Sequence, residues 1–248
     1  MNPKIDNLKL GKAHDFCASG EAKLVAIFIH GIASDSSAFG KALDYLEKSE
    51  KMKEVRFIAF DLLGSGKSYK SDELNYDYKD QLMALHNSIQ SLELNIPLVL
   101  VGHSMGTLIA TRYATKYKNS VRELILISPP IYTEEDLENP AFKAGMKVFR
   151  EAVSVKNRKI LGEKSFNNSM EKIVNNKKNY ATLASLEIPA VLIYGVQDQF
   201  IGSYNIPKLL KENPGRFTTI KTDGRHGVSR DKYTELLKVL EEALSEIS

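Results

Sequence analysis

Short apolar runs alternate with longer amphipathic stretches along most of this chain. Six runs have the length and composition of strands: residues 24–29, 55–60, 98–101, 123–127, 190–194 and 217–221. The continuous apolar content of several of them predicts burial on both faces. Apolar residues recur at helical spacing in four other stretches: residues 38–50, 77–94, 105–118 and 230–247. This alternation predicts an α/β fold with a mostly parallel sheet flanked by helices. Residues 5–20 are expected to add an antiparallel edge hairpin.

One long region interrupts the alternation. Between Pro129-Pro130 and Ile188-Pro189 the chain has helical patterns and no strand-like run. A crossover between parallel strands needs only one helix, so this length predicts an insertion. We expect residues 129–185 to form a helical cap, or lid, over the carboxyl ends of the strands, with 1–128 and 186–248 as the core. The alternative is an ordinary helix with long loops.

Composition narrows the class of protein. The 248 residues suit one large domain, and 43% hydrophobic with 26% charged residues is ordinary for a soluble globular protein. A formal charge of +3 gives no reason to expect a nucleic-acid or membrane partner. Cys17 is the only cysteine, which excludes an intrachain disulfide. The first twenty residues lack the apolar core of a signal peptide, so a cytoplasmic location is expected.

The most informative motif is a G-x-S-x-G turn between a predicted strand and a predicted helix. The apolar run 98–101 leads directly into Gly102 and Ser104, and a helical pattern follows Gly106. Glycines without a Cβ let strand and helix close around so tight a turn, which leaves the serine hydroxyl exposed at its apex. A plain Gly/Ser turn would not explain the apolar run before it. Ser104 is therefore the candidate nucleophile.

A serine nucleophile needs a base and a carboxylate that orients the base. Of the five histidines, His226 lies in a glycine-flanked loop between the last predicted strand and the last helix. Asp198 stands just past the buried run 190–194, at the sheet edge where ligands gather. Its rival is Asp223, and the alternative role for Asp198 is to form a turn. We predict Ser104, Asp198 and His226 as catalytic residues.

The same chemistry needs two hydrogen-bond donors for an oxyanion. One is the backbone N–H of Met105, directly after the serine. The second is expected in the segment after the run 24–29, from the N–H of Ile32 or that of Ala33. Loss of one such donor costs roughly 3–4 kcal/mol of transition-state stabilisation. His30 in this segment is expected to serve structure instead of proton transfer.

A phosphate-loop look-alike lies at residues 61–68. Gly64-Ser65-Gly66-Lys67-Ser68 ends like a P-loop, but Asp61 stands where that motif requires a glycine. The stretch fits D-x-x-G-x-G-x-S instead. We assign it to a structural loop near the active site and not to nucleotide binding.

Together these motifs give a resemblance that covers nearly the whole chain. The chain resembles α/β-hydrolase-fold serine hydrolases, and among them small bacterial carboxylesterases. The resemblance rests on five features in this order: His-Gly, D-x-x-G-x-G-x-S, Gly-His-Ser-Met-Gly, Asp198 and His226. The resemblance implies an eight-stranded, mostly parallel sheet with a helical cap after the sixth strand. Ser104 departs from the aspartate of haloalkane dehalogenases and epoxide hydrolases. Gly-Arg-His-Gly at the end departs from the frequent Gly-x-Gly-His, which leaves the backbone setting of His226 open.

The predicted function is cleavage of an ester or thioester of a small acyl substrate, with no metal or other cofactor. Three alternatives stay open: a carbon–carbon bond hydrolase, a perhydrolase or cofactor-free oxygenase, and a non-catalytic receptor on a hydrolase scaffold. Basic residues outnumber acidic ones over residues 142–185. They would steer an acidic substrate such as an acyl group on a carrier, or merely form a solvated face. The sequence leaves the oligomeric state open. Four apolar residues are candidates for an acyl pocket: Phe142, Met146, Phe149 and Met170.

Overall fold

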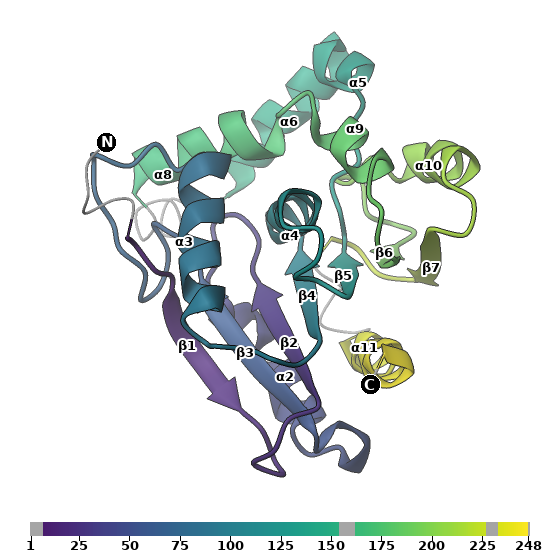
Figure 1. Cartoon of the computed structure of the whole chain (residues 1–248). Helices are drawn as coiled ribbons and strands as arrows, with labels where there is room; N and C mark the ends of the chain where they lie inside the picture. Colours follow the sequence, from purple (N-terminus) through teal and green to yellow (C-terminus); the bar gives the residue numbers. More distant parts are fainter. Residues whose placement is uncertain (1–6, 154–161, 227–232, 248) are drawn as a thin grey trace.

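The computed structural model describes residues 7–153, 162–226 and 233–247. Within them, seven strands form one sheet in the order β1-β3-β2-β4-β5-β6-β7 (Figure 1). The strands are β1 (Gly11–Phe16), β2 (Leu24–Ile29), β3 (Val55–Asp61), β4 (Leu98–His103), β5 (Glu123–Ile127), β6 (Ala190–Gly195) and β7 (Phe217–Thr222). All pair in parallel except β1, which runs antiparallel to β3. The predicted mostly parallel sheet is confirmed.

Two details differ from the prediction. The described residues contain seven strands instead of eight, because residues 7–20 supply a single edge strand, β1, and no hairpin. The observed strands also run up to two residues beyond the predicted ones. His103 and Asp61, which end β4 and β3, are polar, so apolar patterning alone stops short of them.

The two faces of the sheet are buried under different helices. On β2, Leu24, Ala26 and Phe28 pack with the helices α2 (Gly40–Leu46) and α11 (Tyr233–Ile247). The alternating residues of β2 pack with α3 (Tyr78–Gln90) and α4 (Met105–Lys116) on the other face. Since successive strand residues point to opposite faces, an uninterrupted apolar run fits burial on both sides.

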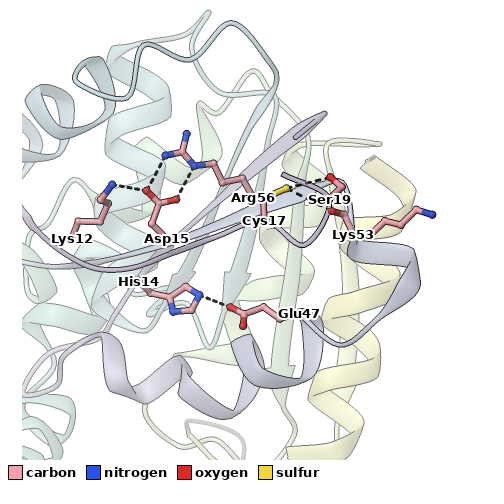
Figure 2. A network of polar contacts seen from close by, with 8 residues as sticks. All are labelled: Lys12, His14, Asp15, Cys17, Ser19, Glu47, Lys53 and Arg56. Carbon is pink, nitrogen blue, oxygen red and sulfur yellow. Dashed lines mark hydrogen bonds and ion pairs between the residues drawn. The ribbon is translucent and has the colours of Figure 1, made fainter. Parts of the chain in front are cut away.

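The edge strand β1 is fastened by polar contacts (Figure 2). Arg56 of β3 donates to both carboxylate oxygens of Asp15, at 2.7 and 2.8 Å. These bonds hold the pKa of Asp15 down at about 2. On the strand's other side His14 contacts Glu47, the residue that follows α2. The sole cysteine, Cys17, lies at the end of β1 with its thiol 3.6 Å from the carbonyl oxygen of Lys53.

Helices fill the chain between β5 and β6, which we call the cap segment (residues 129–185). They are α5 (Glu134–Glu138), α6 (Pro140–Ala152), α8 (Glu163–Ser169), the π-helical turn η3 (Met170–Val174) and α9 (Asn179–Ala184). Figure 1 shows them in a row across one end of the sheet, above the arrowheads of β4 and β5. Shorter elements complete the chain: η1 (Ser36–Phe39), η2 (Glu50–Met52), η4 (Ser203–Asn205) and α10 (Ile206–Glu212).

The two halves of the cap segment are held differently. Phe166, Met170 and Ile173 of α8 and η3 are almost fully buried in the main core. Asn168 of α8 also donates to the carbonyl oxygen of Asn75. By contrast, every residue of α6 whose side chain is described is exposed or half-buried. The described helices include none long and apolar enough to cross a membrane.

Candidate active site

Ser104 sits at a strained turn between β4 and α4. Its φ of 51° and ψ of −120° lie outside the regions that side-chain-bearing residues ordinarily occupy. Its backbone N–H donates to the carbonyl oxygen of Ile127, and its own carbonyl oxygen accepts from the N–H and the hydroxyl of Thr107. The turn is thereby fixed from both sides, so its strain is maintained by the surrounding hydrogen bonds.

The glycines of this turn are required by close packing. A Cβ on Gly102 would lie 2.6 Å from the backbone nitrogen of Thr107. A Cβ on Gly106 would lie 2.7 Å from the carbonyl oxygen of His30 and closer still to that of Ile29. Both neighbours are backbone atoms that cannot rotate away. The predicted reason for these glycines agrees with this packing.

The structure brings the three predicted catalytic side chains together. Nε2 of His226 lies 3.1 Å from the Ser104 hydroxyl oxygen, and Nδ1 of His226 lies 2.9 Å from a carboxylate oxygen of Asp198. The Asp198 side chain is fully buried, and its other oxygen accepts the N–H of Phe200 at 2.9 Å. The rival Asp223 is exposed. The arrangement can pass a proton from the hydroxyl to an imidazole oriented by a carboxylate.

The loops that carry Asp198 and His226 lie side by side. The N–H of Gln197 donates to the carbonyl oxygen of Gly224, and a Cβ on Gly195 would overlap that same oxygen. Glycine at position 195 therefore lets the loops after β6 and β7 approach until Asp198 meets His226. The unusual Gly-Arg-His-Gly order had left the backbone setting of His226 open. The contact between the two loops shows where that backbone lies.

The other four histidines have structural surroundings. Nε2 of His30 accepts the N–H of Leu62 at 2.9 Å, which leaves Nδ1 to donate to the carbonyl oxygen of Gly31. His86 stacks on Tyr117 with ring centroids 4.0 Å apart, and His14 faces Glu47.

His103 lies directly before the serine, at the end of β4. Burial, reinforced by the nearby charge of His226, lowers the pKa of His103 to about 3. The ring is therefore neutral near pH 7. Its Nε2 is buried and finds no hydrogen-bond partner among the described residues. His103 lies 5.5 Å from the His226 ring, centroid to centroid, and adds no positive charge to the site.

The segment after β2 lies directly against the nucleophile. A Cβ on Gly31 would lie 3.1 Å from the Cβ of Ser104, and Ile32 lines the same cleft as Ser104 and His226. Met105 is the first residue of α4, where backbone N–H groups have no acceptor within the helix. In the described part of the chain, neither Ile32 nor Met105 donates its N–H to a protein acceptor. Both candidate oxyanion donors are thus available.

The loop at residues 61–68 anchors this segment. Asp61 accepts the N–H groups of Ser36 and Lys67, each at 2.8 Å. Burial alone would raise the pKa of Asp61, but these bonds lower it below its ordinary value. A Cβ on Gly66 would overlap the Asp61 carboxylate. The backbone N–H groups of Gly64, Ser65, Lys67 and Ser68 all donate to protein acceptors, which agrees with the structural role predicted for the loop.

The cleft above Ser104 is small and apolar. Its volume is about 10 Å³, room for roughly one water molecule. The walls come mainly from the cap segment and from the loop after Asp198: Ile32, Pro130, Tyr132, Met146, Phe149, Val174 and Phe200. A ligand larger than a water molecule can therefore enter only when some of these side chains move.

Two of the four residues expected to contact substrate lie elsewhere. Met146 and Phe149 line the cleft. Phe142 packs edge-on against Tyr132, with centroids 4.6 Å apart, and lines a neighbouring cavity instead. Met170 does not reach the cleft, because it points from η3 into the main core and is 0% exposed.

Matches to known proteins agree with this architecture. The model of the Hydrolase_4 family, described as serine aminopeptidase, S33, matches residues 20–179. The chain belongs to this family. It is therefore an α/β-hydrolase-fold protein of the serine hydrolase kind, and the resemblance seen in its motifs is confirmed.

Individual relatives cover the chain to different extents. The probable lysophospholipase BODYGUARD 1 of Arabidopsis thaliana is 34% identical over 107 residues, which are 43% of this chain and only 23% of the plant protein. The pimeloyl-[acyl-carrier protein] methyl ester esterase of Wigglesworthia glossinidia brevipalpis is 25% identical over 223 residues, 77% of this chain and 82% of that protein. The crystal structure of a monoacylglycerol lipase from Paleococcus ferrophilus superposes with a TM-score of 0.72 at 20% identity. It covers 97% of this chain and all of the lipase, which supports the fold alone.

Sequence patterns did not identify several residues of the cleft above Ser104. Phe200 packs edge-on against His226, with centroids 5.9 Å apart, and meets Phe149 at 5.1 Å. The hydroxyl of Tyr132 donates to the carbonyl oxygen of Phe200. Proximity in sequence was the available signal, since Phe200 follows Asp198 by two residues and Tyr132 follows Pro130, just past β5. No group of three or more His, Cys, Asp or Glu within the described ranges is arranged to hold a metal ion.

Proposed function

We propose that this protein hydrolyses carboxylic esters or thioesters of small acyl substrates through a covalent acyl-enzyme. The observation that carries the proposal is the continuous chain of contacts from the Ser104 hydroxyl through His226 to Asp198, at 3.1 and 2.9 Å. A hydroxyl in such a chain becomes nucleophilic as its proton moves to the imidazole.

The proposed steps use these three side chains in turn. Ser104 Oγ forms a bond to the acyl carbon while its proton passes to Nε2 of His226. The bond from the acyl carbon to the leaving oxygen or sulfur then breaks, and His226 gives the proton to that leaving group. Water attacks the acyl-enzyme with His226 again as base, which releases the acid and restores Ser104. Asp198 orients the ring and stabilises its charged form.

Backbone donors stabilise the negative charge in both tetrahedral intermediates. The N–H groups of Met105 and Ile32 flank Ser104 and have no protein acceptor among the described residues. Donors fixed beforehand in a site that excludes water act strongly on a developing oxyanion. The apolar walls supplied by Met146, Phe149 and Phe200 suit an acyl chain.

The names of the relatives favour esters among the substrates open to this mechanism. The plant relative is a probable lysophospholipase, and the bacterial one is a methyl ester esterase. The plant proteins extend far beyond the matched region, so the proposal rests first on this chain's own geometry.

A test compares Ser104→Ala with Ser19→Ala, a change at an exposed serine next to Cys17. Ser104→Ala is expected to abolish hydrolysis of p-nitrophenyl butyrate while the circular dichroism spectrum stays unchanged, and Ser19→Ala is expected to retain full activity. A fluorophosphonate probe should label the wild type and not Ser104→Ala. Unchanged turnover in Ser104→Ala would refute the mechanism, and a wild type that resists the probe would favour a non-catalytic receptor.

A further inference from the structure

A second, larger cavity adjoins the catalytic cleft. It has a volume of about 610 Å³ and lies in the cap segment, with walls from α5, α6 and α8. Met146 lines both this cavity and the cleft above Ser104, so the two spaces are neighbours. The volume is within the range of small-molecule sites, roughly 300–1,000 Å³. Phe142, Met146 and Phe166 give the cavity an apolar part.

The remaining walls are strongly charged. Four basic and two acidic residues line the cavity, an excess of two positive charges. Among them Lys177 is paired with Glu138 at 2.5 Å, and Arg150 donates to the side-chain oxygen of Asn167 at 2.8 Å. Lys143 and Lys147 form no ion pair with a carboxylate among the described residues, although, after Lys177, the charge of Lys143 helps to lower the pKa of Glu138.

The two unpaired lysines lie one turn apart on α6. Both are exposed, and like charges at this spacing weaken a helix slightly. Neither lysine is held in a close ion pair among the described residues, and both line the cavity. A phosphate monoester complements them better than a carboxylate does, because its charge of nearly −2 at pH 7 can balance both ammonium groups.

The neighbouring cleft indicates which part of a substrate would carry this phosphate. The walls of the cleft above Ser104 are apolar and suit an acyl chain. The wider, charged cavity suits the other side of the scissile bond, the group that must depart after acylation. Resting on the proposed function, we propose that this cavity binds a phosphate carried by the leaving group of an acyl ester or thioester, with Lys143 and Lys147 as its recognition residues.

The test uses two thioesters with the same acyl group. Butyryl-coenzyme A carries phosphates on its leaving group, and S-butyryl-N-acetylcysteamine keeps the thioester but lacks them. Reversing both lysines, Lys143→Glu with Lys147→Glu, is expected to lower kcat/KM for butyryl-coenzyme A by about tenfold, since each exposed charge pair contributes modestly. The value for the neutral thioester should change by less than about twofold.

Controls isolate the local charge. Lys51→Glu on η2, exposed at the end of the sheet opposite the cap segment, should leave both values unchanged. Lys143→Arg with Lys147→Arg should retain the wild-type preference. If the reversed variant folds poorly, Lys143→Gln with Lys147→Gln should give a smaller loss confined to butyryl-coenzyme A.

The source of the phosphate is decided by a second pair of substrates. The same variants are assayed with a 1-acyl-lysophosphatidic acid and the 1-monoacylglycerol of equal chain length. A loss confined to the phosphorylated member of either pair supports the proposal and identifies the leaving group as coenzyme A, which carries a phosphate monoester, or as a glycerol phosphate. Equal losses on charged and neutral members, no loss on either phosphorylated substrate, or an equal effect of Lys51→Glu overturns it. Failure of the wild type to cleave even the neutral esters would instead count against the proposed hydrolysis itself.

Discussion

Replacing Asp198 by asparagine tests the orientation of the general base. In the wild type, one carboxylate oxygen accepts from Nδ1 of His226 and the other accepts the N–H of Phe200, both at 2.9 Å. Asparagine can keep its oxygen on the Phe200 N–H, which turns its NH₂ group toward His226. Nδ1 must then accept a hydrogen bond, so the ring proton moves to Nε2, the atom that has to take the proton of Ser104. We therefore expect Asp198→Asn to fold like the wild type but to hold His226 in a tautomer that cannot accept the proton of Ser104.

The size of the effect follows from this exchange of roles. A wrong tautomer in a serine–histidine–carboxylate relay lowers kcat by roughly 10⁴-fold, which corresponds to about 5.5 kcal/mol in the activation barrier. The matched control is Asp223→Asn, an exposed position three residues before His226 that should change activity by less than about twofold. The assay is steady-state hydrolysis of p-nitrophenyl butyrate, with thermal melting to verify folding. Activity of Asp198→Asn within tenfold of the wild type, or a large loss in Asp223→Asn, would contradict the relay.

Two further predictions concern stability. Gly106→Ala forces a Cβ against the backbone carbonyls of Ile29 and His30, so the free energy of unfolding measured in urea should fall by about 3 kcal/mol or more. The control Gly145→Ala places its Cβ in open space on α6, so its stability should be unchanged or slightly higher. Burial lowers the pKa of His103 from 6.5 to about 3. Between pH 6.5 and pH 3 the imidazole of His103 is therefore protonated in the unfolded chain and neutral in the native protein. As the pH is lowered from 6.5 toward 3, the free energy of unfolding of the wild type should therefore decrease. Its decrease per pH unit should exceed that of His103→Gln by ~1.4 kcal/mol. Parallel pH profiles of the wild type and His103→Gln would refute the prediction for His103. Equal free energies of unfolding for Gly106→Ala and Gly145→Ala would refute the prediction for Gly106.

The sequence by itself indicated the layered fold and singled out the three side chains that the structure brings into contact. Strands such as β2 were predicted to the residue, because burial on both faces requires an unbroken apolar run and such a run is visible in one dimension. Ser104, Asp198 and His226 were identifiable because each follows a strand whose carboxyl end reaches the same edge of a parallel sheet. The roles of Gly102 and Gly106 followed from the tight turn that the motif demands.

Only the tertiary structure decided which cap residues meet the substrate cleft. Phe142, Met146, Phe149 and Met170 look alike in sequence, yet Met170 is buried in the core while Met146 and Phe149 line the cleft. Helical periodicity gives the apolar face of a helix but not the partner that the face packs against. Phe200 was missed for the same reason, since its contact with Phe149 joins two segments 51 residues apart in the sequence. The pairing of distant side chains depends on the angle and distance at which whole elements dock, and that information is not local to any stretch of chain.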